Sequence, residues 1–142
     1  MKITQGWLSV GTRLESPNTD ERPDSADISL LVIHNISLPP EQFGGPYIGQ
    51  LFTNCLNPEE HPYFAEICDL KVSSHLLIDR DGVIVQFVPF SQRAWHAGVS
   101  EFDGRSNCND FSIGIEMEGS DNTPYTDSQY SALAKVTDLL LE

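Results

Sequence analysis

The stretch Phe111-Ser112-Ile113-Gly114-Ile115-Glu116-Met117 decides the fold of this chain. Its apolar residues alternate strictly with Ser112, Gly114 and Glu116, and a period of two predicts a β-strand with one apolar face. The apolar face is expected to pack on the core, which leaves Glu116 on the opposite face. Because Ser112 and Gly114 are small, we expect open volume above the sheet beside the Glu116 carboxyl.

A second stretch, Leu30-Leu31-Val32-Ile33-His34, predicts another strand. A continuous β-branched and aliphatic run is typical of a buried, central strand. Its last residue, His34, then lies at the carboxyl end of a strand, where α/β folds tend to place their sites. An imidazole and a nearby carboxylate are the basic components of metal-assisted hydrolysis. Two bland interpretations stay open: a core histidine bonded to the backbone, and a solvent-facing Glu116.

The remaining elements are predicted by turn residues, apolar spacing and caps. In chain order they are a surface arm over residues 1–28 packed through Trp7 and Leu8, short helices over 47–53 and 59–67, a hairpin of 75–78 and 83–88 around Asp81-Gly82, and a helix after Thr126 with a capping box completed by Gln129. His75 is expected to make structural hydrogen bonds. Trp95 could stack on a sugar ring or cover the core.

Composition restricts the classes of function. A chain of 142 residues is expected to form one domain, and its net charge of −13 argues against nucleic acid or an anionic membrane as partner. No apolar run approaches the roughly 18 residues of a membrane span, and we identify no signal peptide, so a cytoplasmic location is expected. The three cysteines are widely spaced, which predicts free thiols.

The order of four motifs resembles a known family. The motifs are Leu31–Asn35, Val72–Gly82, Ala94–Gly98 and Asn109–Glu116. Together they resemble the type-2 N-acetylmuramoyl-L-alanine amidases, which share a fold with peptidoglycan recognition proteins and phage T7-type lysozyme. Within the family the chain is most similar to the cytosolic AmpD branch, the 1,6-anhydro-N-acetylmuramoyl-L-alanine amidases of cell-wall recycling. The resemblance covers essentially the whole chain and implies an α/β (α+β) fold, with a central mixed β-sheet flanked by helices.

The resemblance also implies a mechanism and a set of site residues. One Zn²⁺ is held by His34 and two further ligands, and Glu116 activates the attacking water. Asn35, Lys71 and Trp95 are expected to contact an anhydro-muropeptide substrate, with Lys71 meeting a peptide carboxylate. The bond cut joins the lactyl carbonyl of the muramoyl sugar to L-alanine of the stem peptide.

The two further ligands are expected beyond residue 142. Residues 1–142 are therefore expected to form a single amidase domain that lacks its C-terminal segment, is monomeric, and is inactive by itself. One alternative is a non-catalytic muropeptide-binding module, although a pure binder needs neither His34 nor Glu116. Another is an unrelated acidic α/β domain in which His34 is structural and H34A affects stability alone.

Overall fold

A computed structural model describes residues 1–142, and its centre is a five-stranded sheet in the order β3-β7-β6-β11-β5. The strands are β3 (Thr12–Arg13), β5 (Leu30–Ile36), β6 (Leu76–Ile78), β7 (Ile84–Gln86) and β11 (Ser112–Glu118). Strand β11 is parallel to both β5 and β6, β3 is parallel to β7, and β6 is antiparallel to β7. The sheet is therefore mixed, as the family resemblance implied.

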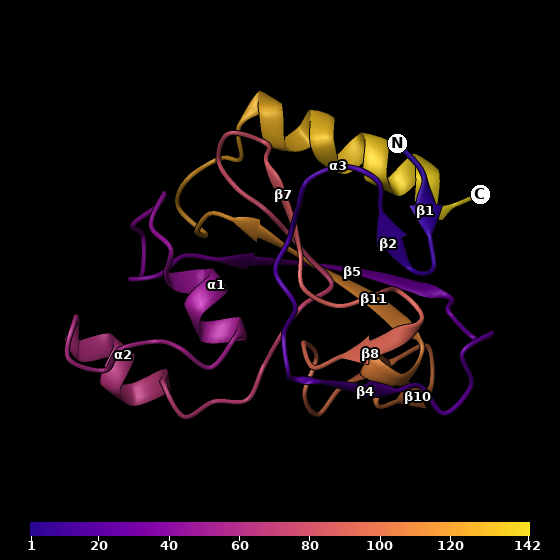
Figure 1. The fold of residues 1–142 in the computed structure, drawn as a ribbon, viewed down its shortest axis with the longest axis horizontal. Helices are drawn as coiled ribbons and strands as arrows, with labels where there is room; N and C mark the ends of the chain where they lie inside the picture. The colour runs from indigo at the N-terminus through magenta and orange to yellow at the C-terminus, as the bar shows by residue number, and fades with distance from the viewer.

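Helices cover the two faces of the sheet. Helix α3 (Asp127–Leu140) lies along one side, and α1 (Tyr47–Phe52) and α2 (Pro62–Ile67) group together on the other (Figure 1). The α3 side buries the apolar face of β11, and the α1–α2 side buries Leu77 of β6. Because Glu116 and Leu77 are register partners, the Glu116 face of β11 looks toward the α1–α2 side. No helix of the chain combines the length and apolar character needed to cross a membrane.

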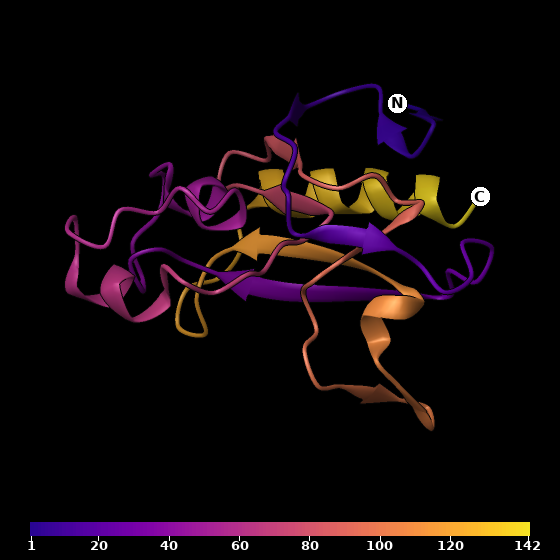
Figure 2. The same ribbon diagram turned by 60° about the horizontal axis from the view of Figure 1, so that its bottom comes forward.

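Short strands and one 3-10 turn complete the fold. They are β1 (Ile3–Thr4), β2 (Trp7–Leu8), β4 (Thr19–Glu21), β8 (Gln92–Ala94), β9 (Glu101–Phe102), β10 (Arg105–Ser106) and η1 (Cys108–Asp110). Strand β4 pairs antiparallel with β8, which fixes the N-terminal segment beside the loop before β9. The hairpin of β9 and β10 projects away from the sheet (Figure 2).

Several local predictions are confirmed. Strand β11 alternates as expected, β6 and β7 form the predicted hairpin, and α3 begins with the predicted capping box, in which Thr126 and Gln129 bond each other's backbone. All three cysteines are free thiols.

Two predictions about placement are wrong. Strand β5 is an edge strand and only half-buried, with Ile33 42% exposed, because β11 lies between β5 and β6 and leaves β5 at the end of the sheet. The segment 1–28 is more than a surface arm, since Ser16, Asn18 and Arg22 are buried within it. Their polar groups bond backbone carbonyls elsewhere in the chain, so this segment is part of the folded interior.

Candidate active site

The pairing of β5 with β11 brings His34 and Glu116 together. The two residues are direct register partners in parallel strands, so their side chains leave the sheet on the same face. Sequence spacing predicted that each strand carries one reactive side chain. The structure adds that these strands are neighbours.

The Glu116 carboxyl is buried without a hydrogen-bond partner for its Oε2 atom. Burial alone raises the pKa of Glu116 from 4.5 to about 8. A buried acceptor with no partner costs free energy, and strongly shifted carboxyls gather at functional sites. Glu118 differs, because its carboxylate accepts hydrogen bonds from the backbone N–H groups of Gly44 and Arg80. Glu116 is therefore the carboxyl available for chemistry.

A cleft of about 290 Å³ opens beside Glu116. It is lined by Lys71, Trp95, His96 and Glu116 together with apolar side chains from α1 and neighbouring segments. The structure thus brings together three of the residues predicted to act in catalysis or binding. Lys71 is exposed at this cleft, where its ammonium group is available to an anionic ligand.

Asn35 is the predicted site residue that the structure places elsewhere. It follows His34 on β5, so its side chain leaves the opposite face of the sheet. Its Nδ2 donates to Oδ1 of Asp121 at 2.9 Å, and it does not line the cleft. A contact between Asn35 and substrate stays a prediction.

His96 is the site residue that sequence reasoning missed. Its Nδ1 lies 2.9 Å from Nε2 of His34, and its Nε2 lies 2.9 Å from Oγ of Ser112. A Cβ built on Gly114 would come within 2.4 Å of the His96 ring. The prediction of open volume above Gly114 is therefore wrong, because the His96 imidazole occupies that space. A glycine inside a strand often marks such a close approach, and that signal was present in the sequence.

The imidazoles of this site are held uncharged by burial. Desolvation lowers the pKa of His34, and it lowers the pKa of His96 to about 3, with smaller effects from the charges of His34 and Arg22. A neutral imidazole has a free ring nitrogen that can accept a proton or bind a metal.

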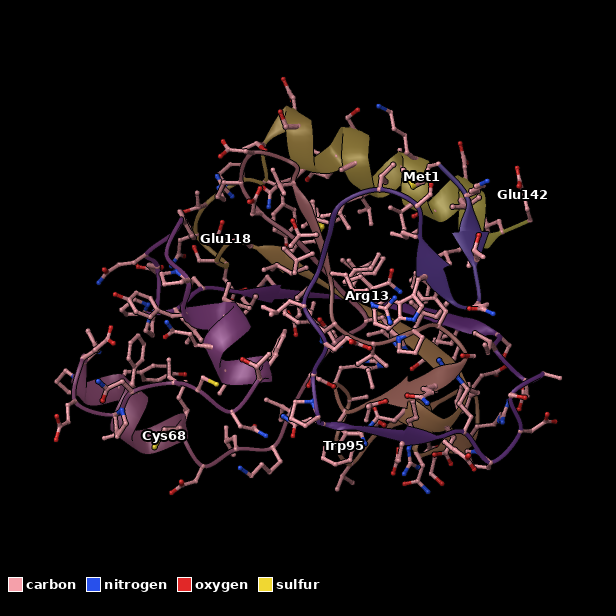
Figure 3. The ribbon with its side chains drawn as sticks, viewed as in Figure 1. Met1, Arg13, Cys68, Trp95, Glu118 and Glu142 are labelled. Atoms are coloured by element: carbon pink, nitrogen blue, oxygen red, sulfur yellow. The ribbon has the colours of Figure 1, made fainter.

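Trp95 is fixed by an ionic network at the mouth of the cleft. Its Nε1 donates to Oδ1 of Asp20 at 3.1 Å, and Arg93 pairs with both Asp20 and Asp110 at 2.6 and 2.5 Å. The hydrogen bond from Arg93 holds the pKa of Asp20 below its usual value. Figure 3 shows Trp95 beside the N-terminal segment that carries Asp20. The indole is therefore oriented rather than free to rotate.

Two buried polar residues support the floor of the site. His75 accepts a hydrogen bond from the Gly114 N–H at Nδ1, and its Nε2 donates to the Gln92 carbonyl, so the predicted structural role of His75 is confirmed. Arg22 donates to the carbonyl oxygens of Phe90, Asn109, Asp110 and Ser112, and burial lowers its pKa to about 10. These bonds fix the loop and strand from which His96 and Glu116 project.

The metal-binding capacity of the site follows from its donors. His34 offers one neutral imidazole, which is a normal zinc ligand. Residues 1–142 contain no group of three or more His, Cys, Asp or Glu side chains able to hold a metal ion. The structure therefore fits one ligand of a zinc centre, and zinc sites need three or four protein ligands.

Comparison with known proteins decides the family. A family model described as N-acetylmuramoyl-L-alanine amidase matches residues 24–142. The chain belongs to the N-acetylmuramoyl-L-alanine amidase family. It is 59% identical over 142 residues to the 1,6-anhydro-N-acetylmuramyl-L-alanine amidase AmpD of Escherichia coli K12, a match that covers 100% of this chain and 78% of the relative.

Solved structures agree with this assignment. A crystal structure of an AmpD derivative matches with a TM-score of 0.97 and 60% identity, over 99% of this chain and 79% of that one. The protein AmpDh3 of Pseudomonas aeruginosa, solved in complex with an anhydromuramic pentapeptide, matches with a TM-score of 0.58 and 25% identity, over 84% of this chain and 47% of that one. The amidase family and the α+β fold that the motifs indicated are confirmed, and an unrelated acidic domain is excluded.

Proposed function

We propose that this chain carries the main part of a zinc-dependent amidase of peptidoglycan recycling. Its substrate would be a 1,6-anhydro-N-acetylmuramoyl peptide, and the bond cut would join the lactyl carbonyl to L-alanine. The similarity to AmpD over the full chain supports this substrate, as does the anhydromuramic ligand of AmpDh3. The observation that carries the proposal is the Glu116 carboxyl, which lines the cleft, is the register partner of His34, and has a buried Oε2 atom without a hydrogen-bond partner.

His34 is proposed as one zinc ligand, with two further ligands supplied from beyond residue 142. When bound, zinc would supply Lewis-acid activation of the scissile carbonyl and of water. This division of ligands agrees with the finding that residues 1–142 contain no group of three or more side chains able to hold a metal ion.

Glu116 is proposed as the proton-transferring group. Its ionised Oε2 takes a proton from water as the water oxygen attacks the lactyl carbonyl carbon. The protonated carboxyl then gives that proton to the alanine nitrogen as the C–N bond breaks. The products are 1,6-anhydro-N-acetylmuramic acid, whose lactyl carboxylate is now free, and a stem peptide with a free amino group.

The cleft residues are proposed to position substrate. Trp95, held by Asp20, offers an aromatic face suited to a sugar ring. Lys71 offers a cation to a peptide carboxylate, and a contact from Asn35 is retained as part of the proposal. We also propose that the protein acts as a monomer in the cytoplasm.

The test compares this chain with the same chain extended through its natural downstream sequence. The extended form should bind about one zinc and release L-alanyl peptide from an anhydro-muropeptide, whereas the 142-residue chain should do neither. Full activity of the extended form in excess chelator would refute the metal mechanism. If neither form bound zinc or cut substrate, and both bound muropeptide, the protein would be a recognition module.

A further inference from the structure

Three side chains form a hydrogen-bonded row beside Glu116. Nε2 of His34 lies 2.9 Å from Nδ1 of His96, and Nε2 of His96 lies 2.9 Å from Oγ of Ser112. The other ring nitrogen of His34, Nδ1, makes no hydrogen bond within residues 1–142. The row therefore begins at a free nitrogen and ends at a fully buried hydroxyl.

His96 is held firmly within this row. Asn109 Oδ1 accepts hydrogen bonds from the backbone N–H groups of His96 and Ala97 at 3.1 and 2.9 Å. The His96 ring lies directly over Gly114, where any larger residue would collide with it. Backbone anchors and a glycine platform together aim Nδ1 of His96 at His34.

Only one hydrogen can lie between two neutral imidazoles that face each other. In one arrangement His34 Nε2–H donates to His96, whose Nε2–H donates to Ser112, and Nδ1 of His34 keeps its lone pair. In the reverse arrangement Ser112 donates to His96, His96 donates to His34, and Nδ1 of His34 carries an unpaired hydrogen. Each arrangement leaves one hydrogen without an acceptor among residues 1–142, that of the Ser112 hydroxyl in the first and that of His34 Nδ1 in the second, and only the first leaves a lone pair on Nδ1 of His34.

We propose that His96 is a positioning residue that holds His34 in the tautomer with hydrogen on Nε2 and thereby presents Nδ1 to a metal ion. The reference to a metal rests on the function proposed above. Histidines that bind metals usually donate their other ring N–H to a carboxylate, carbonyl or water. Here the acceptor is a second imidazole, and Ser112 completes the row. The glycine at position 114 is needed because a side chain there would displace that imidazole.

The direction in which the hydrogen bonds of this row run, from His34 to Ser112 or the reverse, can be measured in the unmodified chain. Nitrogen-15 NMR of histidine-labelled protein at pH 7.5, with chelator present, distinguishes a ring nitrogen that carries hydrogen from one that does not. We expect hydrogen on Nε2 of both His34 and His96 and bare Nδ1 atoms on both. Hydrogen on Nδ1 of His34 would overturn the proposal without any variant.

Variants test whether His96 is the cause. H96A should leave His34 in a mixture of both tautomers, and H96N should restore a single one, because the asparagine Oδ1 can occupy the place of Nδ1. H61A is the matched control, since His61 caps α2 and takes no part in the row. A single Nε2–H tautomer of His34 in folded H96A would refute the positioning role.

Zinc affinity supplies the second measurement, in the chain extended through its natural downstream sequence. Competition with a chromophoric chelator should show H96A binding zinc about 10- to 100-fold more weakly than the unmodified protein, with H96N within a few-fold. Equal affinity in H96A would overturn the proposal. If the unmodified extended protein bound no zinc, the metal assignment of His34 would fall, while the tautomer measurement would still decide the hydrogen-bonded row.

Discussion

Replacing Glu116 with glutamine is expected to stabilise this chain at neutral pH. The Glu116 carboxyl is buried, one of its oxygens has no partner, and burial raises its pKa to about 8. Ionisation is therefore easier in the unfolded chain than in the folded one. Glu116 contributes fully to stability below its unfolded pKa of 4.5, and this contribution is lost as the pH rises toward 8. Glutamine fills the same volume and does not ionise.

The magnitude follows from the shift in pKa. Each unit of pKa corresponds to about 1.4 kcal/mol between the two protonation states. Between pH 5 and pH 7.5 the unmodified chain should lose about 3 kcal/mol of stability through Glu116 alone, whereas E116Q loses none through this position. The advantage of E116Q over the unmodified chain should therefore grow by about 3 kcal/mol over that interval.

Urea unfolding followed by tryptophan fluorescence, at several pH values and with chelator present, measures this difference. The buried histidines titrate in both proteins, so the comparison isolates Glu116. E118Q is the matched control: its carboxylate accepts two backbone N–H bonds, so its loss should destabilise the chain at neutral pH. The reasoning would be refuted if the difference between E116Q and the unmodified chain changed by less than about 1 kcal/mol from pH 5 to pH 7.5.

Three further perturbations test other parts of the site. In the extended form proposed above, D20A should release the Trp95 indole and raise KM about 3- to 10-fold with kcat little changed, the effect of roughly one partly exposed hydrogen bond. Steady-state kinetics beside D27A as control would contradict this if both variants behaved alike. R22M should cost about 2–4 kcal/mol in urea unfolding, because buried carbonyl oxygens lose their donor, and a loss no larger than that of R105M, an exposed ion pair, would contradict the buried role. G114A should cost about 1–3 kcal/mol by displacing the His96 ring, and an unchanged unfolding midpoint would show that the ring moves aside freely.

The features that sequence predicted correctly are local. Alternation along Phe111–Met117 correctly predicted the two faces of β11. Asp81-Gly82 predicted the turn of the hairpin, and Thr126 with Gln129 predicted the start of α3. Each depends on residues within a few positions of one another, which is the range over which turn geometry and capping operate.

The features that sequence missed depend on partners far apart in the chain. The aliphatic run of β5 is equally compatible with a central and an edge strand, and only the pairing of β11 with β6 excludes β5 from the centre. Arg22 has no apolar pattern around it, and its burial follows from carbonyl oxygens of residues 90–112 that converge on it. His96 reaches His34 across 62 positions, and the only local sign of it was the glycine at position 114.

The electrostatics of the active face differ from those of the rest of the molecule. The chain carries a net charge of −13, yet burial favours the uncharged forms of Glu116, His75 and His96 by placing their pKa values at about 8, 3 and 3. Burial is the sole cause of the raised pKa of Glu116, and no positive group acts to lower it. A cation that entered beside Glu116 would stabilise the ionised form and lower its pKa toward the range in which a carboxylate can take a proton from water. A cation bound there would thus offset part of the free energy that the chain loses when this buried carboxyl ionises.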